Sequence, residues 1–245
     1  MRNIKLTIEY DGTSYAGWQK QKNAATIQQE LESAIEKLTG NKIEVIGSSR
    51  TDAGVHARGF TANFYTNSTI PASSFREAIN SKLPRDIVIL QSDEVNKDFH
   101  ARYSCIGKQY SYTILNRLQP SALERNYVYH YKKKLDFSSM EIACQYFVGK
   151  HDFTAFRSTG SSVKTSIRTV HKAWLEKSGE KITFYVEADG FLYNMVRIMI
   201  GTLIDVGIGK IFPKDLEEII KSKERCKAGN TAPASGLCLE AVYYN

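Results

Sequence analysis

Hydrophobic and polar residues alternate with a period of two over residues 4–10, which predicts a half-buried strand ending at Asp11-Gly12. From Thr26 the period becomes that of a helix, and Thr26 with Gln29 fits a capping box. Gly40 stops the helix. Its predicted apolar stripe contains Ile27, Leu31, Ala34, Ile35 and Leu38.

The rest of the first hundred residues continues this order. A second strand is predicted around residues 43–46, and a third carries Phe60, Ala62 and Phe64 on one face. A helix starts at Pro71 and closes at Pro84, and a short strand follows at residues 87–90. Strand, helix, strand, strand, helix, strand is the split βαβ, ferredoxin-like order shared by RNA-recognition folds.

The second half starts again in a similar way, with an alternating strand around residues 110–114. Ser138 and Glu141 predict a capping box at the head of a helix. Residues 165–176 and 181–188 predict a hairpin, followed by helices over 191–206 and 213–223 and a closing strand at 237–241. We therefore expect an α+β fold of two ferredoxin/RRM-like halves, residues 1–104 and 105–245. Each half has an antiparallel sheet covered by helices, and a cleft lies between the halves.

Composition narrows the function classes. The 245 residues carry 33 Lys+Arg against 26 Asp+Glu, and the net charge of +7 permits a polyanionic partner. The four cysteines form no CxxC pair, which favours reduced thiols. The most apolar segment, residues 195–208, contains Arg197 and Asp205 and falls short of the roughly 20 residues that a bilayer requires. We expect a cytoplasmic protein without a membrane segment.

Sequence motifs for metals and nucleotide cofactors are missing. Residues 207–210 read GIGK but lack the first glycine of a phosphate loop, since position 204 is Ile. No GxGxxG, HExxH or GxSxG string and no zinc-type spacing of Cys and His occurs. The sequence therefore argues against a metal- or nucleotide-dependent enzyme.

Residues 47–60, GSSRTDAGVHARGF, place Asp52 between Arg50 and Arg58 in a glycine-rich loop. The loop joins two predicted strands without a hairpin dipeptide, and either arginine can hold the carboxylate ionised. An aspartate that only caps the turn is the simpler alternative.

Arg197 interrupts the apolar run at 194–201. Burying a lone guanidinium is costly, so its side chain either reaches solvent or meets a carboxylate. If Arg197 is buried, Asp52 is a natural partner across the two halves, and the pair suits a nucleophile.

Aromatic and basic residues indicate a surface for RNA. Tyr110 lies on a strand face, where packing is the default role and stacking on a base is the alternative. Basic residues also recur beside predicted loops, and each by itself is an ordinary solvated charge. Together with four aromatic residues they would fit a phosphate-tracking groove with stacking platforms: Lys20, Lys22, Arg102, Arg157, Lys164 and Arg168 with Tyr15, Trp18, Phe153 and Phe156.

Nearly the whole chain resembles the tRNA pseudouridine synthases of the TruA type. The most specific string is RTDAGVHA at 50–57, and the order of the weaker strings makes chance implausible. These strings are YDGT at 10–13, GWQ at 17–19, YSY at 110–112, HDF at 151–153, FR at 156–157, RTV at 168–170, MVR at 195–197 and APASGL at 232–237.

The resemblance implies that Asp52 is the catalytic aspartate, with Arg50 and Arg197 as neighbours and Tyr110 packing on the target base. It also implies conversion of uridine to pseudouridine at positions 38, 39 and 40 of the tRNA anticodon stem-loop. The family works as homodimers with tRNA spanning both subunits, without metal or organic cofactor. Because the uridine must leave its stack, Arg58 is a candidate to hold the gap.

Two positions depart from the family pattern, and two other functions stay open. Ser49 stands where the family often has Gly, and Phe60 where it often has Gln.

The residues alone leave open whether Asp52 attacks the uracil ring, attacks the ribose C1′ or helps form a glycal. A non-catalytic RNA-binding protein shares the charge and aromatics but lacks the expected RNP string. A small-molecule lyase or isomerase is the third alternative.

Overall fold

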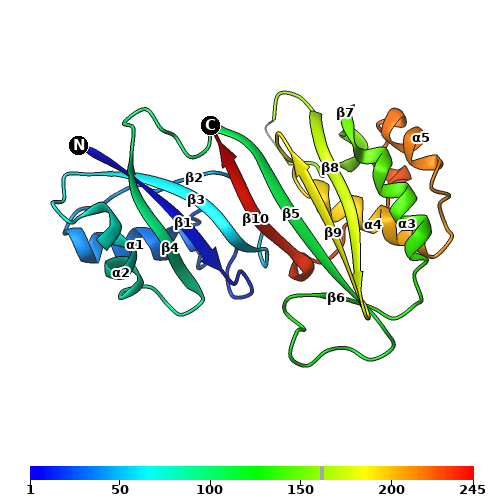
Figure 1. The fold of residues 1–245 in the computed structure, drawn as a ribbon, viewed down its shortest axis with the longest axis horizontal. Helices are drawn as coiled ribbons and strands as arrows, with labels where there is room; N and C mark the ends of the chain where they lie inside the picture. Colours follow the sequence, from blue (N-terminus) through cyan, green and yellow to red (C-terminus); the bar gives the residue numbers. More distant parts are fainter. Residues whose placement is uncertain (161–162) are drawn as a thin grey trace. The chain divides into compact units, whose positions relative to one another are not determined.

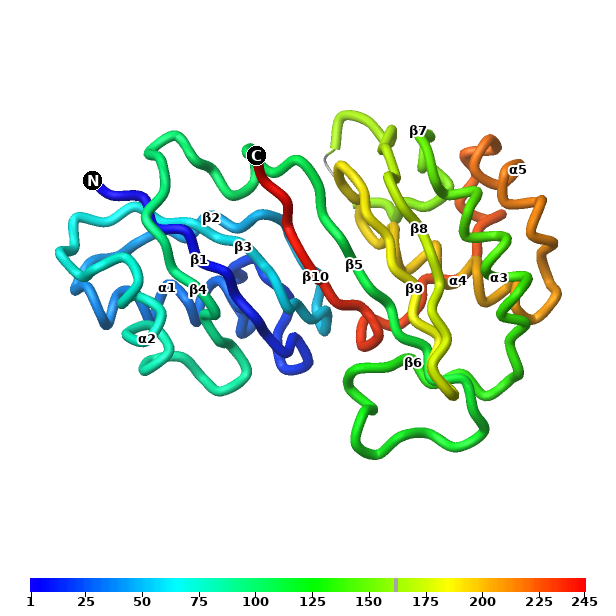
Figure 2. Tube along the Cα trace, in the orientation of Figure 1, coloured from blue at the N-terminus to red at the C-terminus, as the bar shows by residue number. Residues whose placement is uncertain are grey.

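The computed structural model describes residues 1–160 and 163–245 and has the expected mixed α+β class. The chain divides into two compact units: residues 1–106 with 238–245, and residues 107–237. Figures 1 and 2 trace the chain through both units.

The first unit contains a sheet with strand order β4-β1-β3-β10. The predicted first strand is β1 (Arg2–Tyr10), which pairs antiparallel with both β3 (His56–Thr66) and β4 (Ile87–Val95). The last strand of the chain, β10 (Leu237–Tyr244), pairs parallel with the start of β3. The short β2 (Ile46–Gly47) pairs with β3 further along.

The first helix forms as its sequence predicts. It is α1 (Ile27–Thr39), whose N-terminus is capped by the Thr26 side chain accepting a hydrogen bond from the Gln29 amide. Gly40 ends it in the left-handed region, with φ of 72°. The apolar stripe is buried except at Leu38, which is half-buried. Figure 1 shows α1 and α2 lying together beside the sheet of this unit.

Three elements of the first unit differ from their predicted bounds. The predicted strand at 43–46 reduces to β2. The helix expected over 71–84 is a 3-10 turn (Ala72–Ser74) followed by α2 (Phe75–Asn80). It ends early because the Asn80 carboxamide exchanges two hydrogen bonds with the backbone of Ile89 on β4. Strand β4 continues to Val95, beyond the predicted end at residue 90, because it pairs with β1 as far as Asn3.

The second unit has the strand order β5-β9-β8-β7, with β6 pairing parallel to β5. The strand predicted around 110–114 is β5, and the predicted hairpin forms around Gly179, whose φ is 59°. Helices α3, α4 and α5 gather beside β8 and β7 in Figure 1. The bounds are β5 Cys105–Asn116, β6 Tyr129–Tyr131, α3 Phe137–Cys144, β7 Gly149–Asp152, β8 Ile167–Ser178, β9 Lys181–Ala188, α4 Met195–Gly207 and α5 Asp215–Ser222.

The helix starts in this unit are less accurately predicted. The N-cap of α3 is Asp136, whose carboxylate accepts from the Ser138 amide, so the capping box assigned to Ser138 is wrong. Helix α4 begins at Met195 because Asn194 takes the left-handed conformation, with φ of 61°. Helix α5 begins two residues after Pro213, and Lys223 is its left-handed cap.

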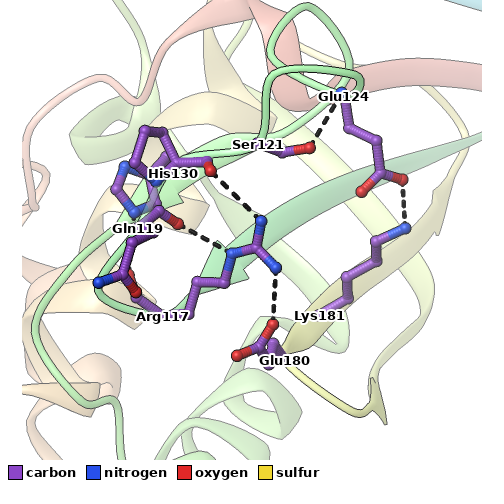
Figure 3. A network of polar contacts seen from close by, with 8 residues as sticks. Arg117, Gln119, Ser121, Glu124, His130, Glu180 and Lys181 are labelled. Carbon is purple, nitrogen blue, oxygen red and sulfur yellow. Dashed lines mark hydrogen bonds and ion pairs between the residues drawn. The ribbon is translucent and has the colours of Figure 1, made fainter.

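A network of polar contacts ties the segment after β5 to the turn of the β8–β9 hairpin (Figure 3). Arg117 forms an ion pair with Glu180, with the nitrogen and oxygen 2.9 Å apart, and donates to the Gln119 carbonyl. Lys181 pairs with Glu124. These contacts fix a segment without regular secondary structure against the end of the sheet.

Candidate active site

The loop that carries Asp52 is held by the backbone of a second segment, residues 15–18. The Trp18 amide donates to the Thr51 carbonyl at 3.1 Å, and the Gly54 amide donates to the Tyr15 carbonyl at 3.3 Å. The Asp52 carbonyl itself accepts from the Val55 amide at 3.1 Å. The half-buried Asp52 therefore lies in a loop whose backbone is fixed on both sides.

The same segment is attached to α1. The carbonyls of Gly17 and Trp18 accept from the amides of Ile27 and Gln28, at 3.2 and 3.0 Å. These are amides of the first helical turn, which find no partner inside the helix. The helix start, the 15–18 segment and the Asp52 loop thus form one hydrogen-bonded series.

Two glycines permit this close contact. A Cβ at Gly12 would lie 2.0 Å from the Val55 carbonyl oxygen, and one at Gly17 would lie 2.5 Å from the Thr51 oxygen. Gly17 also has a φ of +95°, which side chains rarely adopt. The glycines of the YDGT and GWQ strings therefore serve to let one backbone approach the other.

His56 connects the end of the Asp52 loop to the end of β1. Its buried Nδ1 lies 3.1 Å from the Gly12 amide nitrogen and 3.1 Å from an Asp11 carboxylate oxygen. Nδ1 accepts from Gly12 only when it carries a lone pair, and donates to Asp11 only when it carries a proton. Either form joins the two segments, so His56 connects them whichever tautomer it adopts.

The two departures from the family pattern have different surroundings. Phe60 is fully buried and stacks on Trp18, with ring centroids 4.0 Å apart and planes at 25°. An aromatic partner therefore suits this position. The Ser49 hydroxyl is buried and has no hydrogen-bond partner among the residues that the structure describes. Nothing in the structure explains why a serine stands at that position.

The two arginines that flank Asp52 are both exposed. The Arg58 guanidinium forms an ion pair with Glu240 of β10, with the nitrogen and oxygen 2.5 Å apart. Arg50 lies two residues before Asp52, within the loop. The roles that the sequence assigns to Arg50 and Arg58 stay predictions.

In the second unit, Arg197 lies on the first turn of α4 and is half-buried. Its Nε donates to the Ala232 carbonyl at 2.7 Å, and its Nη1 donates to the Asn194 side chain at 2.8 Å. The Ala232 amide donates back to the Arg197 carbonyl at 3.1 Å. The proposed pairing of Arg197 with Asp52 joins residues of different units and stays a prediction.

Tyr110 is 6% exposed and meets Phe191 edge to face, with ring centroids 5.0 Å apart. Its neighbour Tyr112 donates its hydroxyl to the Pro233 carbonyl at 2.7 Å. Gly236 lies so close to the Tyr112 ring that a Cβ there would come within 2.7 Å of it. The strings YSY, MVR and APASGL therefore meet in one place.

Comparison with known proteins decides the family. A family model described as "tRNA pseudouridine synthase" matches residues 6–104 and 143–245. The chain belongs to this family.

The curated relatives agree with the family model. A "tRNA pseudouridine synthase A 2" from Clostridium perfringens is 62% identical, and a "tRNA pseudouridine synthase A" from Clostridium acetobutylicum is 57% identical. Each alignment covers 100% of both chains. Pseudouridine synthases are isomerases, and the enzyme class expected from the sequence is confirmed. Among solved structures, the "Crystal Structure of a Cbf5-Nop10-Gar1 Complex" has a TM-score of 0.40 at 12% identity, covering 96% of this chain and 48% of that chain. A likeness at that level supports no functional argument.

The matched regions contain the Asp52 loop and Arg197, whereas Tyr110 lies outside them. The stacking platforms expected at Trp18, Phe153 and Phe156 are wrong, because the Trp18 ring stacks on Phe60 and the two phenylalanine side chains are completely buried in this synthase. Trp18 is 3% exposed within its stack, and Phe153 and Phe156 pack in the core of the second unit at 0%. Tyr15 is 8% exposed and donates to Asp86. The basic residues near these aromatic residues in the sequence suggested a role in RNA binding, but they carry no information on whether the aromatic side chains are buried.

Within residues 1–160 and 163–245 there is no group of three or more His, Cys, Asp or Glu side chains arranged to hold a metal ion. No helix in the same part of this synthase combines the length and apolarity needed to cross a bilayer.

Proposed function

We propose that this synthase isomerises uridine to pseudouridine at positions 38, 39 and 40 of the tRNA anticodon stem-loop, with Asp52 as the catalytic nucleophile. The full-length relatives named tRNA pseudouridine synthase A support the substrate class. The positions come from the resemblance of the RTDAGVHA loop and its companion strings.

The observation that carries the proposal is the fixed backbone around Asp52. Amide–carbonyl bonds from Trp18 and to Tyr15 hold the residues on either side of it. A reacting carboxylate gains most from being held close to its attack geometry before substrate binds. A merely solvated turn has no need of two close backbone approaches at Gly12 and Gly17.

The reaction is balanced without an external reagent. The C1′–N1 bond breaks, a C1′–C5 bond forms, and the proton on C5 leaves while N1 gains one. No electrons are gained or lost, so we expect neither metal nor organic cofactor. A carboxylate also stabilises positive charge at C1′, as in glycoside hydrolysis.

The other residues have supporting roles in this proposal. Arg50 and Arg197 keep Asp52 ionised, Tyr110 packs on the target base, and Arg58 fills the gap left by the flipped uridine. The enzyme works as a homodimer on tRNA in the cytoplasm.

Release of tritium tests the central assignment. Unmodified tRNA transcripts carry tritium at uridine C5, and the wild type should release it. Asp52→Asn and Asp52→Ala should lower the rate at least ~10³-fold while tRNA binding persists. The exposed Asp98 offers a matched control, and Asp98→Asn should release tritium like the wild type. Equal release by the Asp52 variants contradicts the proposal.

Transcripts with cytidine at 38, 39 and 40 test the positions, since all release should cease on them. Persistent release would place the reaction elsewhere in the tRNA.

Two further variant sets test the partners of Asp52 and of the base. Arg197→Met should lower activity, and unchanged activity and stability would contradict the buried pair.

Tyr110→Phe keeps the ring and should stay active, whereas Tyr110→Ala should not. If both behave like the wild type, Tyr110 does not stack on the base.

A further inference from the structure

The turn at residues 100–104, after β4, holds an aromatic ring out in solvent. Tyr103 is 77% exposed, and no sequence pattern had singled it out. The His100 ring lies beside it, with centroids 4.3 Å apart and planes at 34°. The Arg102 guanidinium carbon lies 5.8 Å from the centre of the Tyr103 ring, within the range of a cation–π contact.

Hydrogen bonds inside the turn fix its shape. The His100 Nδ1 accepts from the amides of both Arg102 and Tyr103, at 3.2 Å each. The Ser104 hydroxyl accepts from the His100 amide at 3.1 Å, and the Ser104 amide donates to the His100 carbonyl at 2.9 Å. Because Nδ1 accepts, the neutral His100 ring carries its proton on Nε2.

Buried polar groups anchor the turn to the first unit. The Ala101 amide donates to the Asn63 side chain at 2.8 Å, and the Ala101 carbonyl accepts from the Tyr244 hydroxyl at 2.7 Å. Asn63 in turn donates to Asn3, which donates to the Phe99 carbonyl at 2.9 Å. Both asparagines are fully buried. Burying amides is costly unless they are bonded, and here their bonds converge on this turn.

An exposed aromatic ring in a rigid turn, with basic neighbours, has the properties needed to bind an unpaired base. A single exposed tyrosine is ordinary on a protein surface. A rigid exposed ring, however, loses little freedom on binding and offers a face on which any base can stack. Its neighbours here are an imidazole and a guanidinium, and the exposed Arg102 can contact a phosphate. Tyrosine and arginine also occur in protein interfaces, so the choice of RNA rests on the basic character of the protein, whose net charge of +7 favours a polyanionic partner.

We propose that the 100–104 turn is a second RNA contact of this enzyme, in which Tyr103 stacks on an unpaired base of the substrate tRNA and Arg102 contacts an adjacent phosphate. This inference rests on the proposed function, since the RNA is the tRNA of that reaction. The turn takes no part in the chemical step.

Affinity for an unmodified tRNA transcript tests the stacking. Tyr103→Ala should raise the Kd roughly 5- to 100-fold, as expected for the loss of one stacked base. Tyr103→Phe should stay within about twofold of the wild type. The rate of tritium release at saturating tRNA should be the same for all three proteins. Arg102→Gln should lower the slope of log Kd against log salt by about one.

The exposed aromatic Phe212, 67% exposed, supplies the matched control, and Phe212→Ala should leave the Kd unchanged. A direct signal comes from Tyr103→Trp, whose added fluorescence tRNA should quench, whereas Phe212→Trp should show no such quenching. Equal thermal unfolding of the variants confirms that they are folded.

Three results separate the possible failures. Wild-type affinity in Tyr103→Ala, with an active wild type, overturns the turn proposal alone. Unchanged affinity with an altered sedimentation mass assigns the turn to a protein contact and also overturns it. A wild type that binds tRNA without releasing tritium overturns the proposed function, while the affinity series still decides the role of Tyr103.

Discussion

The indole of Trp18 stacks on the ring of Phe60, with centroids 4.0 Å apart and planes at 25°. Trp18 belongs to the segment that holds the Asp52 loop by backbone hydrogen bonds, and Phe60 lies on β3 just after that loop. Tyr10 adds a third ring, 5.7 Å from Phe60. The loop is therefore supported by aromatic packing as well as by hydrogen bonds.

Phe60→Gln, which restores the residue common in the family, should destabilise this protein by about 2–4 kcal/mol. It removes the stack and buries an amide between the two remaining aromatic rings, those of Trp18 and Tyr10. Phe60→Leu keeps an apolar side chain and should cost about 1–2 kcal/mol. Urea unfolding measures both, and a Phe60→Gln variant as stable as the wild type would show that the stack contributes nothing.

Gly17→Ala should lower both stability and the rate of tritium release, the rate by roughly 10- to 100-fold. The new methyl group would press on the Thr51 carbonyl next to Asp52. Gly40→Ala is the matched control, because Gly40 also has positive φ but nothing within 4 Å of a Cβ. Gly40→Ala should cost about 1 kcal/mol of stability and no activity. Equal activity in the two variants would contradict the close contact.

His56→Gln should destabilise the protein by about 1–3 kcal/mol, because the Gly12 amide loses its acceptor in a buried position. His56→Asn can place an oxygen near the position of Nδ1 and should recover most of that loss. Thermal unfolding measures both. If Asn is no better than Gln, the Gly12 contact is not what His56 supplies.

Arg58→Gln should reduce tRNA turnover while changing the free energy of unfolding by less than about 1 kcal/mol, since an exposed ion pair contributes little. Glu240→Gln removes the charge of the partner and leaves the arginine in place. It should therefore retain turnover. Steady-state kinetics on tRNA separate the two, and identical losses would assign Arg58 to the ion pair instead of the RNA.

Burial raises the pKa of the Cys144 thiol to about 11. Because the folded protein holds this proton more tightly than the unfolded chain, the associated stability is complete below pH 9 and is lost as the pH rises towards 11. At pH 8, iodoacetamide should modify the exposed Cys226 and react with Cys144 on the order of 100-fold more slowly. Mass spectrometry of the modified peptides measures the ratio. Comparable rates would show that Cys144 is accessible in the folded protein.

Elements whose ends and periodicity are encoded in neighbouring residues could be predicted from the sequence. Helix α1 follows from Thr26, its apolar stripe and Gly40, and the β8–β9 hairpin follows from alternation around Gly179. The start of α4 depends on the left-handed Asn194, which no periodicity reveals. Strands β6 and β7 are short and exist through pairing with distant strands, so their sequences carry little signal.

The candidate site could likewise be predicted only in part. The specific string around Asp52 identifies the loop, but the amide–carbonyl contacts with Tyr15 and Trp18 come from tertiary packing. Exposure was the weakest prediction: Phe153 is buried, whereas Tyr103 stands in solvent. Both are aromatic residues near basic ones, and only the fold distinguishes them.

Strand β10 has a consequence for biosynthesis. Residues 238–245 belong to the first unit, where Cys238 and Leu239 pair with His56 and Ala57 directly after the Asp52 loop. A ribosome must therefore translate residues 107–237 before that edge of β3 receives its partner. The Asp52 loop gains this neighbour only after Cys238 and Leu239 have been translated, so a chain truncated before them lacks this support for the loop.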